Sequence, residues 1–268
     1  MKVAPWAKYS LRFVALAYLF VLLVFPIGVI LQRTFGKGIG AFIDSISTPA
    51  AISALNLSLI IVAIVVPVNV VFGVVTALAL VRGRFPGRRF IQGIVDLPFA
   101  VSPIVVGVSL ILLWGPNGWF KFIDEGGFKI IYALPGMVIA TIFVTLPFVV
   151  REVEPVLHEI GEDQEQAAAT LGASKWQTFW RVTLPSIRWG LTYGVVLTVA
   201  RALGEFGAVI MVSLGIAGHS QTLTLLVHGR YIDDHNTFGA YSAATLLMGI
   251  ALIVLLAMTV LDRKREAK

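Results

Sequence analysis

The chain has 268 residues, of which 57% are hydrophobic and 13% are charged, and its formal net charge is +6. Soluble domains are about a quarter charged, so this composition excludes an ordinary soluble protein and indicates an all-α polytopic membrane protein. The absence of cysteine excludes disulfides, thiolate metal sites and cysteine nucleophiles.

Six apolar runs follow one another along the chain, and each is long enough to cross a bilayer core of about 30 Å. They are residues 11–32, 54–81, 94–114, 131–150, 191–217 and 239–261. The first run lacks an A-x-A cleavage site and is predicted to be a retained span. The second would be a helix of about 42 Å, so it is expected to tilt, to bend at Pro67 or to protrude. No second domain is apparent, and residues 1–268 are predicted to form one transmembrane domain.

Lysine and arginine are distributed unequally between the two sides of the predicted bundle. The amino terminus, the loop RGRFPGRR, the loop 151–190 and the tail DRKREAK carry fifteen of them on one side. The other side carries five, and Arg201 lies within a span. Because cytoplasmic loops are enriched in Lys and Arg, both termini and the 151–190 loop are predicted to be cytoplasmic. The basic residues lie at span ends and not on one soluble face, which argues against nucleic-acid binding.

The 151–190 loop contains the stretch EQAAATLGASKWQTFWRVTLP, which runs from Glu165 to Pro185. Asp163 is predicted to cap a helix over 164–171 that is rich in alanine. Gly172 stands where a helix end requires a left-handed residue, and Ser174 with Gln177 is typical of a second capping box. The loop is therefore expected to hold two short helices joined at a glycine.

Three aromatic residues after the second cap, Trp176, Phe179 and Trp180, lie at i, i+3 and i+4 and so share one helix face. An alanine face with a glycine permits close approach of another surface, and the aromatic face can lie on the membrane interface or on the protein's own helix ends. A loop that only packs on its own protein accounts for the same pattern.

The stretch QAAATLGASKWQTFWRVTLP resembles the EAA motif of permease subunits of bacterial ATP-binding-cassette importers. That motif is E-A-A, three residues, G, nine residues, I-x-L-P, and this chain matches it with Gln in place of Glu and Val182 in place of Ile. Glu165 lies next to the substituted position and is a candidate for the missing acid. The resemblance implies a type I importer permease (MetI-like) fold with six transmembrane helices in the bacterial cytoplasmic (inner) membrane.

In that family the motif forms a coupling helix that docks on the ATPase subunit. The resemblance implies this role for the 164–185 loop, and the candidate coupling residues are Gln166, Ala167, Ala168, Leu171, Gly172, Ser174, Lys175 and Trp176. ATP and Mg²⁺ would be bound by the partner ATPase. This chain has no G-x-x-x-x-G-K-[ST] loop, and no cofactor or metal is expected in it.

A narrower resemblance is carried by DLPFAVSP (96–103), FVTLPFVVREVEPVL (143–157) and ARALGEFGA (200–208). These stretches are similar to the sulfate/thiosulfate importer permeases, and to the second of their two paralogues. Molybdate and tungstate permeases have a similar ALGEFGA element and remain the alternative. The resemblance implies as partners a paralogous permease in a heterodimer, two ATP-binding subunits and an external sulfate-binding protein.

Charged side chains inside a predicted span are costly and mark candidate functional positions. Arg201 lies about eleven residues into the fifth predicted span, and Glu205 follows one turn later. The pair either neutralises itself at i, i+4 or leaves Arg201 partly available to an anion in transit. Asn69 and Ser102 are further candidates for the pathway, and the alternative for both is a kinked helix packed on its neighbours. Asp96 is predicted to cap the third span.

Two other functions fit the sequence less well than a permease subunit does. An intramembrane enzyme would need a nucleophile with a base or a metal set, and no span contains His or Cys. A self-contained channel or ion-coupled carrier would be expected to show repeated halves, and no repeat is apparent. Dependence of transport on an ATPase subunit discriminates between these classes.

Overall fold

The structure is a computed structural model that describes the backbone of residues 5–266 and the side chains of residues 9–123 and 126–257. The described residues form helices and no strands. The cations predicted at Lys2, at Lys8 and in the tail after residue 261 lie outside the described side chains. The elements are α1 (Pro5–Leu19), η1 (Phe20–Val24), α2 (Phe25–Phe35), α3 (Ile39–Ile46), α4 (Pro49–Arg82), α5 (Arg88–Ala100), α6 (Pro103–Trp114), α7 (Lys121–Glu125), α8 (Leu134–Ile160), α9 (Asp163–Thr170), α10 (Lys175–Thr178), η2 (Phe179–Thr183), α11 (Leu184–Leu203), α12 (Gly207–Val212), α13 (Leu223–His228), η3 (Gly229–Asp233) and α14 (Thr237–Glu266).

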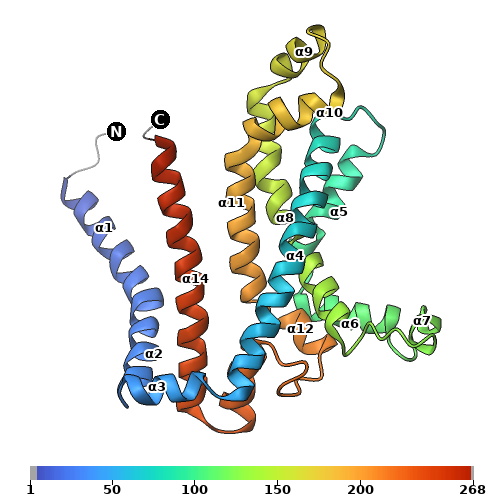
Figure 1. Ribbon diagram of the computed structural model, residues 1–268. Helices are drawn as coiled ribbons and strands as arrows, with labels where there is room; N and C mark the ends of the chain where they lie inside the picture. The colour runs from blue at the N-terminus through green and yellow to red at the C-terminus, as the bar shows by residue number, and fades with distance from the viewer. Residues whose placement is uncertain (1–4, 267–268) are drawn as a thin grey trace.

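The long helices run side by side between two ends of the molecule (Figure 1). The beginning of α1, the end of α14 and the α9–α10 segment lie at one end, and α3, α7 and α12 lie at the other. This arrangement agrees with the prediction that the termini and the 151–190 loop share one side. We call these the α9 end and the α3 end.

Within the described part of the chain, four helical segments are long and apolar enough to cross a membrane: Tyr9–Phe35, Pro49–Arg82, Leu134–Ile160 and Thr237–Ala257. The pair α5–α6 makes a fifth crossing if it is counted as one bent span. These segments correspond to the predicted runs 11–32, 54–81, 131–150, 239–261 and 94–114. The sixth predicted run, 191–217, is divided between α11 and α12.

The third predicted span, 94–114, is broken into α5 and α6, and the helix direction bends by 111° between them. Val101 and Ser102 are extended there, and Pro103 opens α6. Proline disfavours a helical conformation in the residue that precedes it, so the Ser102–Pro103 sequence explains the break. Asp96 therefore lies within α5, which begins at Arg88, and the prediction that it caps this span is wrong.

The fifth predicted span differs at both ends from the range 191–217. Lys175 to Leu203 form a helical path of α10, η2 and α11, with a π-helical turn just before Pro185. Pro185 has no N–H and so cannot continue the regular ladder of helical bonds. In the turn before it, the Leu184 N–H bonds to the Phe179 carbonyl five residues back, as in a π-helix. The helix ends at Leu203 and α12 follows after three residues. Because α8 also continues to Ile160, the loop between helices is shorter than the predicted 151–190.

The core of the bundle is the contact of α8 with α4 and α11. Val149 of α8 is fully buried, and it lies against Gly73 of α4 and Gly194 of α11. A Cβ atom on Gly73 would lie 2.6 Å from the Val149 side chain, and one on Gly194 would lie 3.0 Å from the Val149 Cα. Glycine at these two positions therefore lets the three helices approach closely, as small residues do in membrane bundles.

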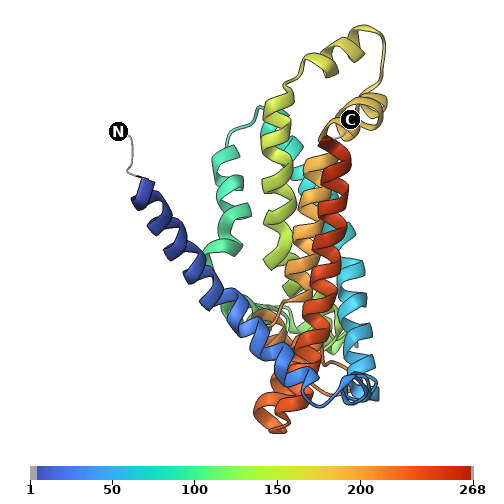
Figure 2. The same cartoon turned by 90° about the vertical axis from the view of Figure 1, so that its left-hand side faces the viewer.

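The amino-terminal arm, α1–η1–α2, diverges from the other helices (Figure 2). Its most apolar window is 0% buried, and it contacts the bundle at the α2–α14 crossing. There the hydroxyls of Thr34 and Thr245 are 2.8 Å apart, and Thr34 is fully buried. This hydrogen bond fixes the α3 end of the arm against α14.

Candidate functional site

The first candidate site is the segment that joins α8 to α11 at the α9 end. The predicted glycine turn is confirmed, since Gly172 has φ = +85°. The Ala173 N–H bonds to the Ala168 carbonyl, and the Gly172 N–H bonds to the Ala169 carbonyl. This pair of bonds is a Schellman motif, which satisfies the last carbonyls of α9. The prediction that Asp163 caps this helix is wrong, because α9 begins at Asp163 and its cap position makes no side-chain bond.

The second predicted cap is confirmed at Ser174. Its hydroxyl accepts from the Gln177 N–H at 3.3 Å, and its own N–H donates to the Gln177 Oε1 at 2.9 Å. The reciprocal bonds orient the first turn of α10. Trp176, Phe179 and Trp180 then form one aromatic cluster, with ring centroids 5.3–6.1 Å apart.

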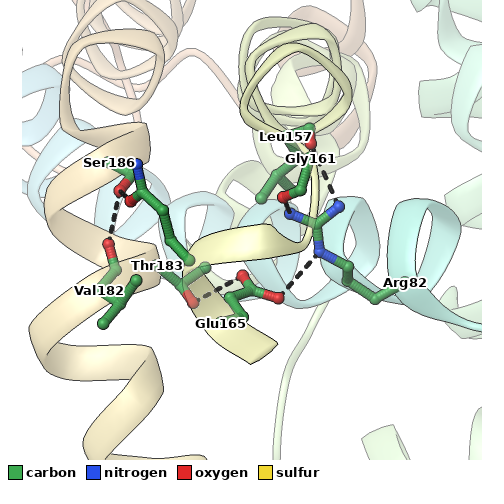
Figure 3. Close-up of polar contacts among 8 residues, drawn as sticks. Arg82, Leu157, Gly161, Glu165, Val182, Thr183 and Ser186 are labelled. Carbon is green, nitrogen blue, oxygen red and sulfur yellow. Dashed lines mark hydrogen bonds and ion pairs between the residues drawn. The ribbon is translucent and has the colours of Figure 1, made fainter. Parts of the chain in front are cut away.

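Glu165, the candidate for the missing acid of the motif, joins three of the long helices (Figure 3). One carboxylate oxygen accepts from the Arg82 Nε at 3.1 Å, and the other accepts from the Thr183 hydroxyl at 2.8 Å. Arg82 is the last residue of α4, and it also donates to the carbonyls of Leu157 and Gly161 at the end of α8. Glu165 therefore connects α9 to the ends of α4 and α8 and to the beginning of the α11 path.

The substituted position of the motif, Gln166, is exposed beside this junction. It lines a groove of about 460 Å³ together with Glu162, Lys175 and Phe179. Beyond the groove, the outermost part of the segment presents apolar side chains to solvent. Leu171 is 89% exposed and Trp176 is 70% exposed, and these two frame the Gly172 turn. The predicted coupling residues Gln166, Ala167, Leu171, Gly172, Ser174, Lys175 and Trp176 are all exposed, and Ala168 is half-buried.

The second candidate site is the break between α11 and α12. Arg201 Nη1 lies 2.7 Å from Glu205 Oε2, so the predicted ion pair is confirmed. The other oxygen of Glu205 accepts from the Ala208 N–H at 2.8 Å, in the first turn of α12. The Glu205 side chain is 1% exposed and that of Arg201 is 34% exposed. The Glu205 carboxylate is therefore held inside the protein, while the Arg201 side chain is partly exposed at a surface of the chain.

The depth of Arg201 follows from the antiparallel contact of α11 with α8. Gly194 lies against Val149, so Arg201, about two turns further along α11, is level with residue 142 or so of α8. That level is near the middle of the uncharged run 134–150. Arg201 is thus placed in the central part of the bundle, where a charge has a large desolvation cost unless it is paired.

The two remaining predicted pathway residues have different surroundings. Asn69 is fully buried, and its Nδ2 donates to the Thr145 hydroxyl at 2.6 Å, which connects α4 to α8. Ser102 is exposed in the α5–α6 break, and its side chain makes no capping bond to α6. The structure does not bring Asn69, Ser102 and Arg201 into one contact.

Sequence reasoning missed the partner of Asp96. Arg151 of α8 contacts the Asp96 carboxylate through Nε at 2.9 Å and through Nη2 at 2.7 Å. The Arg151 guanidinium also lies 5.7 Å from the centroid of the Phe99 ring. Asp96 and Arg151 are 55 residues apart, so no local pattern could pair them, although a charge at the end of each apolar run was a visible signal.

The family model and the curated relatives that match this chain all describe permease components of transport systems. Residues 69–267 match the family described as "Binding-protein-dependent transport system inner membrane component". The chain is 47% identical to "Sulfate transport system permease protein CysW" of Synechocystis sp. over 96% of this chain and 93% of that protein. It is 35% identical to "Sulfate transport system permease protein CysT" of the same organism, over 96% and 91% of the two chains.

Among solved structures, a bacterial ABC transporter involved in the import of the acidic polysaccharide alginate is similar in fold. The TM-score is 0.81 at 18% identity, and the match covers 97% of this chain and 96% of that chain. At this identity the likeness concerns the fold alone.

Proposed function

The chain belongs to the family of binding-protein-dependent transport system inner membrane components, and from this premise we propose that it is the permease subunit of a sulfate importer. It is a multi-pass protein of the inner membrane and a transport subunit, not an enzyme. The observation that carries the substrate is the 47% identity, over nearly the whole chain, to a sulfate permease. Thiosulfate is a second substrate under this proposal, and the molybdate alternative has no support among the relatives described above.

Coupling to an ATPase is assigned to the exposed turn around Gly172. The apolar side chains of Leu171 and Trp176 have no cover in this chain, as expected of residues that dock into a groove of another subunit. Both sides of this turn are fixed, by the Schellman motif that ends α9 and by the capping box that begins α10, so little conformational entropy would be lost on docking. This turn lies at the end of the molecule that the positive-inside rule makes cytoplasmic.

Glu165 is proposed to transmit the movement of the docked turn to the membrane helices. Its carboxylate is bonded to Arg82 at the end of α4 and to Thr183 before α11, and Arg82 is bonded to the end of α8. A displacement of α9 by the ATPase would therefore move the ends of three helices together. Gln166, which replaces the acid of the motif, is left free to contact the ATPase.

For the anion we propose that Arg201 is the cation of the pathway. The Arg201 side chain is one-third exposed near mid-membrane, and Glu205 neutralises part of its charge. A half-compensated cation attracts a divalent oxyanion without retaining it, which transport requires. Ser102, exposed in the α5–α6 break, is proposed to add a hydroxyl donor. Asn69 is proposed to support the pathway without lining it, because its bond to Thr145 fixes α4 to α8.

The partners under this proposal are a paralogous permease in a heterodimer, two ATP-binding subunits and an external sulfate-binding protein. Relatives carry the names of both sulfate permease paralogues, which supports a pair of different permeases. This chain is more similar to the CysW-named relative than to the CysT-named one, so the missing partner would be of the CysT type.

The test is uptake of labelled sulfate by cells that lack this gene and carry the intact chain or a Gly172→Asp variant. A Cβ at Gly172 meets no atom within 4 Å, and Asn and Asp tolerate positive φ better than other residues. The variant should therefore fold and place a charge in the docking surface. Gly172→Asn is the uncharged control of the same shape. We expect uptake with the intact chain and with the control, loss with Asp, and little competition by equimolar molybdate. Normal uptake with Gly172→Asp would show that this turn does not dock.

A further inference from the structure

A basic pocket lies at the α3 end of the molecule, where the last turn of α2 meets the first turn of α14. It has a volume of about 690 Å³ and contains Arg33 and Lys37 on one wall and Phe238 and Tyr241 on the other. The Thr34–Thr245 hydrogen bond joins α2 to α14 next to it. The pocket is thus formed between two helices that are fixed to each other.

The two cations of this pocket have no ion-pair partner among the side chains that the structure describes. Among the described side chains, no carboxylate lies within 4.0 Å of the Arg33 or Lys37 nitrogens. The contact that Lys37 makes is with the Phe238 ring, at 4.6 Å from its centroid. Lys and Arg are depleted at the external side of membrane proteins, so two adjacent cations without a carboxylate partner there are notable and suit an anionic ligand.

The depth of the pocket identifies the kind of anion. Twenty uncharged residues separate Arg12 from Arg33, and as a helix they span about 30 Å, the thickness of a hydrocarbon core. Arg33 therefore lies at the headgroup level opposite Arg12. Tyr241, which also lines the pocket, is of a residue type enriched at the same level. From the pocket toward the α9 end, the arm α1–η1–α2 is apolar, and none of the residues in its most apolar window is buried within the chain, which suits contact with acyl chains.

We propose that this pocket binds the phosphate of an anionic phospholipid in the external leaflet. Arg33 and Lys37 would hold the phosphate oxygens, and the acyl chains would follow the α2 surface toward α1. The bound lipid would lie beside the α2–α14 crossing, where the amino-terminal arm contacts the bundle. This proposal does not depend on which anion the importer carries.

The test is native mass spectrometry of the purified, delipidated importer, incubated with phosphatidylglycerol or with phosphatidylcholine at equal concentration. We expect at least fivefold higher retention of phosphatidylglycerol, and loss of that preference in Arg33→Gln and in Lys37→Gln. Arg33→Lys should restore it. Lys129→Gln removes a predicted external charge outside the pocket and should leave retention unchanged.

Three results would overturn the proposal. Equal retention of the two lipids would mean that acyl chains alone bind. Displacement of phosphatidylglycerol by millimolar inorganic phosphate or sulfate would mean that the pocket takes a free oxyanion. Unchanged lipid retention in Arg33→Gln, with weaker binding of the external binding protein to the importer, would assign the pocket to that protein.

Discussion

The Glu165 junction predicts that one carboxylate is needed for transport but not for assembly. The perturbation is Glu165→Gln, which keeps the shape of the side chain and removes its charge. The side chains of Arg82 and Glu165 are only 18% and 22% exposed, so solvent screens their contact weakly. Arg82 keeps the carbonyls of Leu157 and Gly161 as acceptors, so the ends of α4 and α8 stay joined.

The magnitude follows from the bonds that change. Hydrogen bonds to a charged group contribute about 1.5–3 kcal/mol each, and Glu165 accepts two of them. The glutamine amide can keep both contacts, with its oxygen accepting from Arg82 and its NH2 donating to the Thr183 hydroxyl, but as neutral-acceptor or neutral bonds of about 0.5–1.5 kcal/mol each. A loss of about 2 kcal/mol lowers the equilibrium constant for the aligned position of α9 by roughly 25-fold, since each 1.4 kcal/mol is a factor of ten. Glu165→Ala removes both bonds and should have a larger effect. We expect sulfate uptake by the glutamine variant to fall about tenfold or more.

The assay is the reconstituted importer in proteoliposomes, with sulfate uptake and ATP hydrolysis measured on the same preparation. Uptake per ATP hydrolysed should fall in Glu165→Gln, while the subunits still copurify. Asp163→Asn is the matched control, because Asp163 is an exposed acid of the same helix whose side chain makes no capping bond. Wild-type coupling in Glu165→Gln, or an equal defect in Asp163→Asn, would refute the role of the junction.

Three further predictions concern the helices and the pathway. Arg201→Gln should lower uptake about tenfold or more while the subunits copurify, and normal uptake at wild-type expression would remove Arg201 from the pathway. Gly73→Ala should lower the melting temperature of the purified importer, because the added Cβ would lie 2.6 Å from the Val149 side chain. The overpacking is expected to cost about 1–3 kcal/mol of stability, and an unchanged melting temperature would contradict the close contact of α4 with α8. Arg230→Met should also lower the melting temperature, by about 3 kcal/mol or more in stability, because Arg230 is buried and donates to the Ser45 and Gly239 carbonyls and to the Thr48 hydroxyl; Arg84→Met, at an exposed cation outside the pocket, is the control that should leave it unchanged.

Much of the candidate coupling site could be predicted from the sequence, because its signals are local. A glycine after an alanine-rich helix and the Ser174–Gln177 spacing both describe contacts between residues at most six positions apart. The Arg201–Glu205 ion pair was predicted for the same reason. The failure at Asp163 was also local: the N-terminal turn of α9 offered several adjacent acids, and the pattern could not choose which residue precedes the first helical one.

The partners of the charged side chains could not be predicted. Arg82 reaches Glu165 across 83 positions, and Arg151 reaches Asp96 across 55. Charges at the ends of apolar runs were visible, but a run end has several possible neighbours. Likewise the division of 191–217 depends on Glu205, whose carboxylate begins α12, and hydropathy does not register such a break because both parts are apolar.

The sequence by itself determined that this is a membrane-embedded helical protein, which stretches of the chain supply its apolar helices, and which segment carries the coupling motif. These features follow from hydropathy and from short-range backbone chemistry, which a linear pattern contains. Tertiary structure alone decided that Glu165 faces inward and Gln166 outward, that Arg201 is exposed while Glu205 is buried, and that Arg33 and Lys37 share a pocket with α14. Each of these depends on how distant helices pack, because the direction and exposure of a side chain are set by the neighbours that packing brings to it.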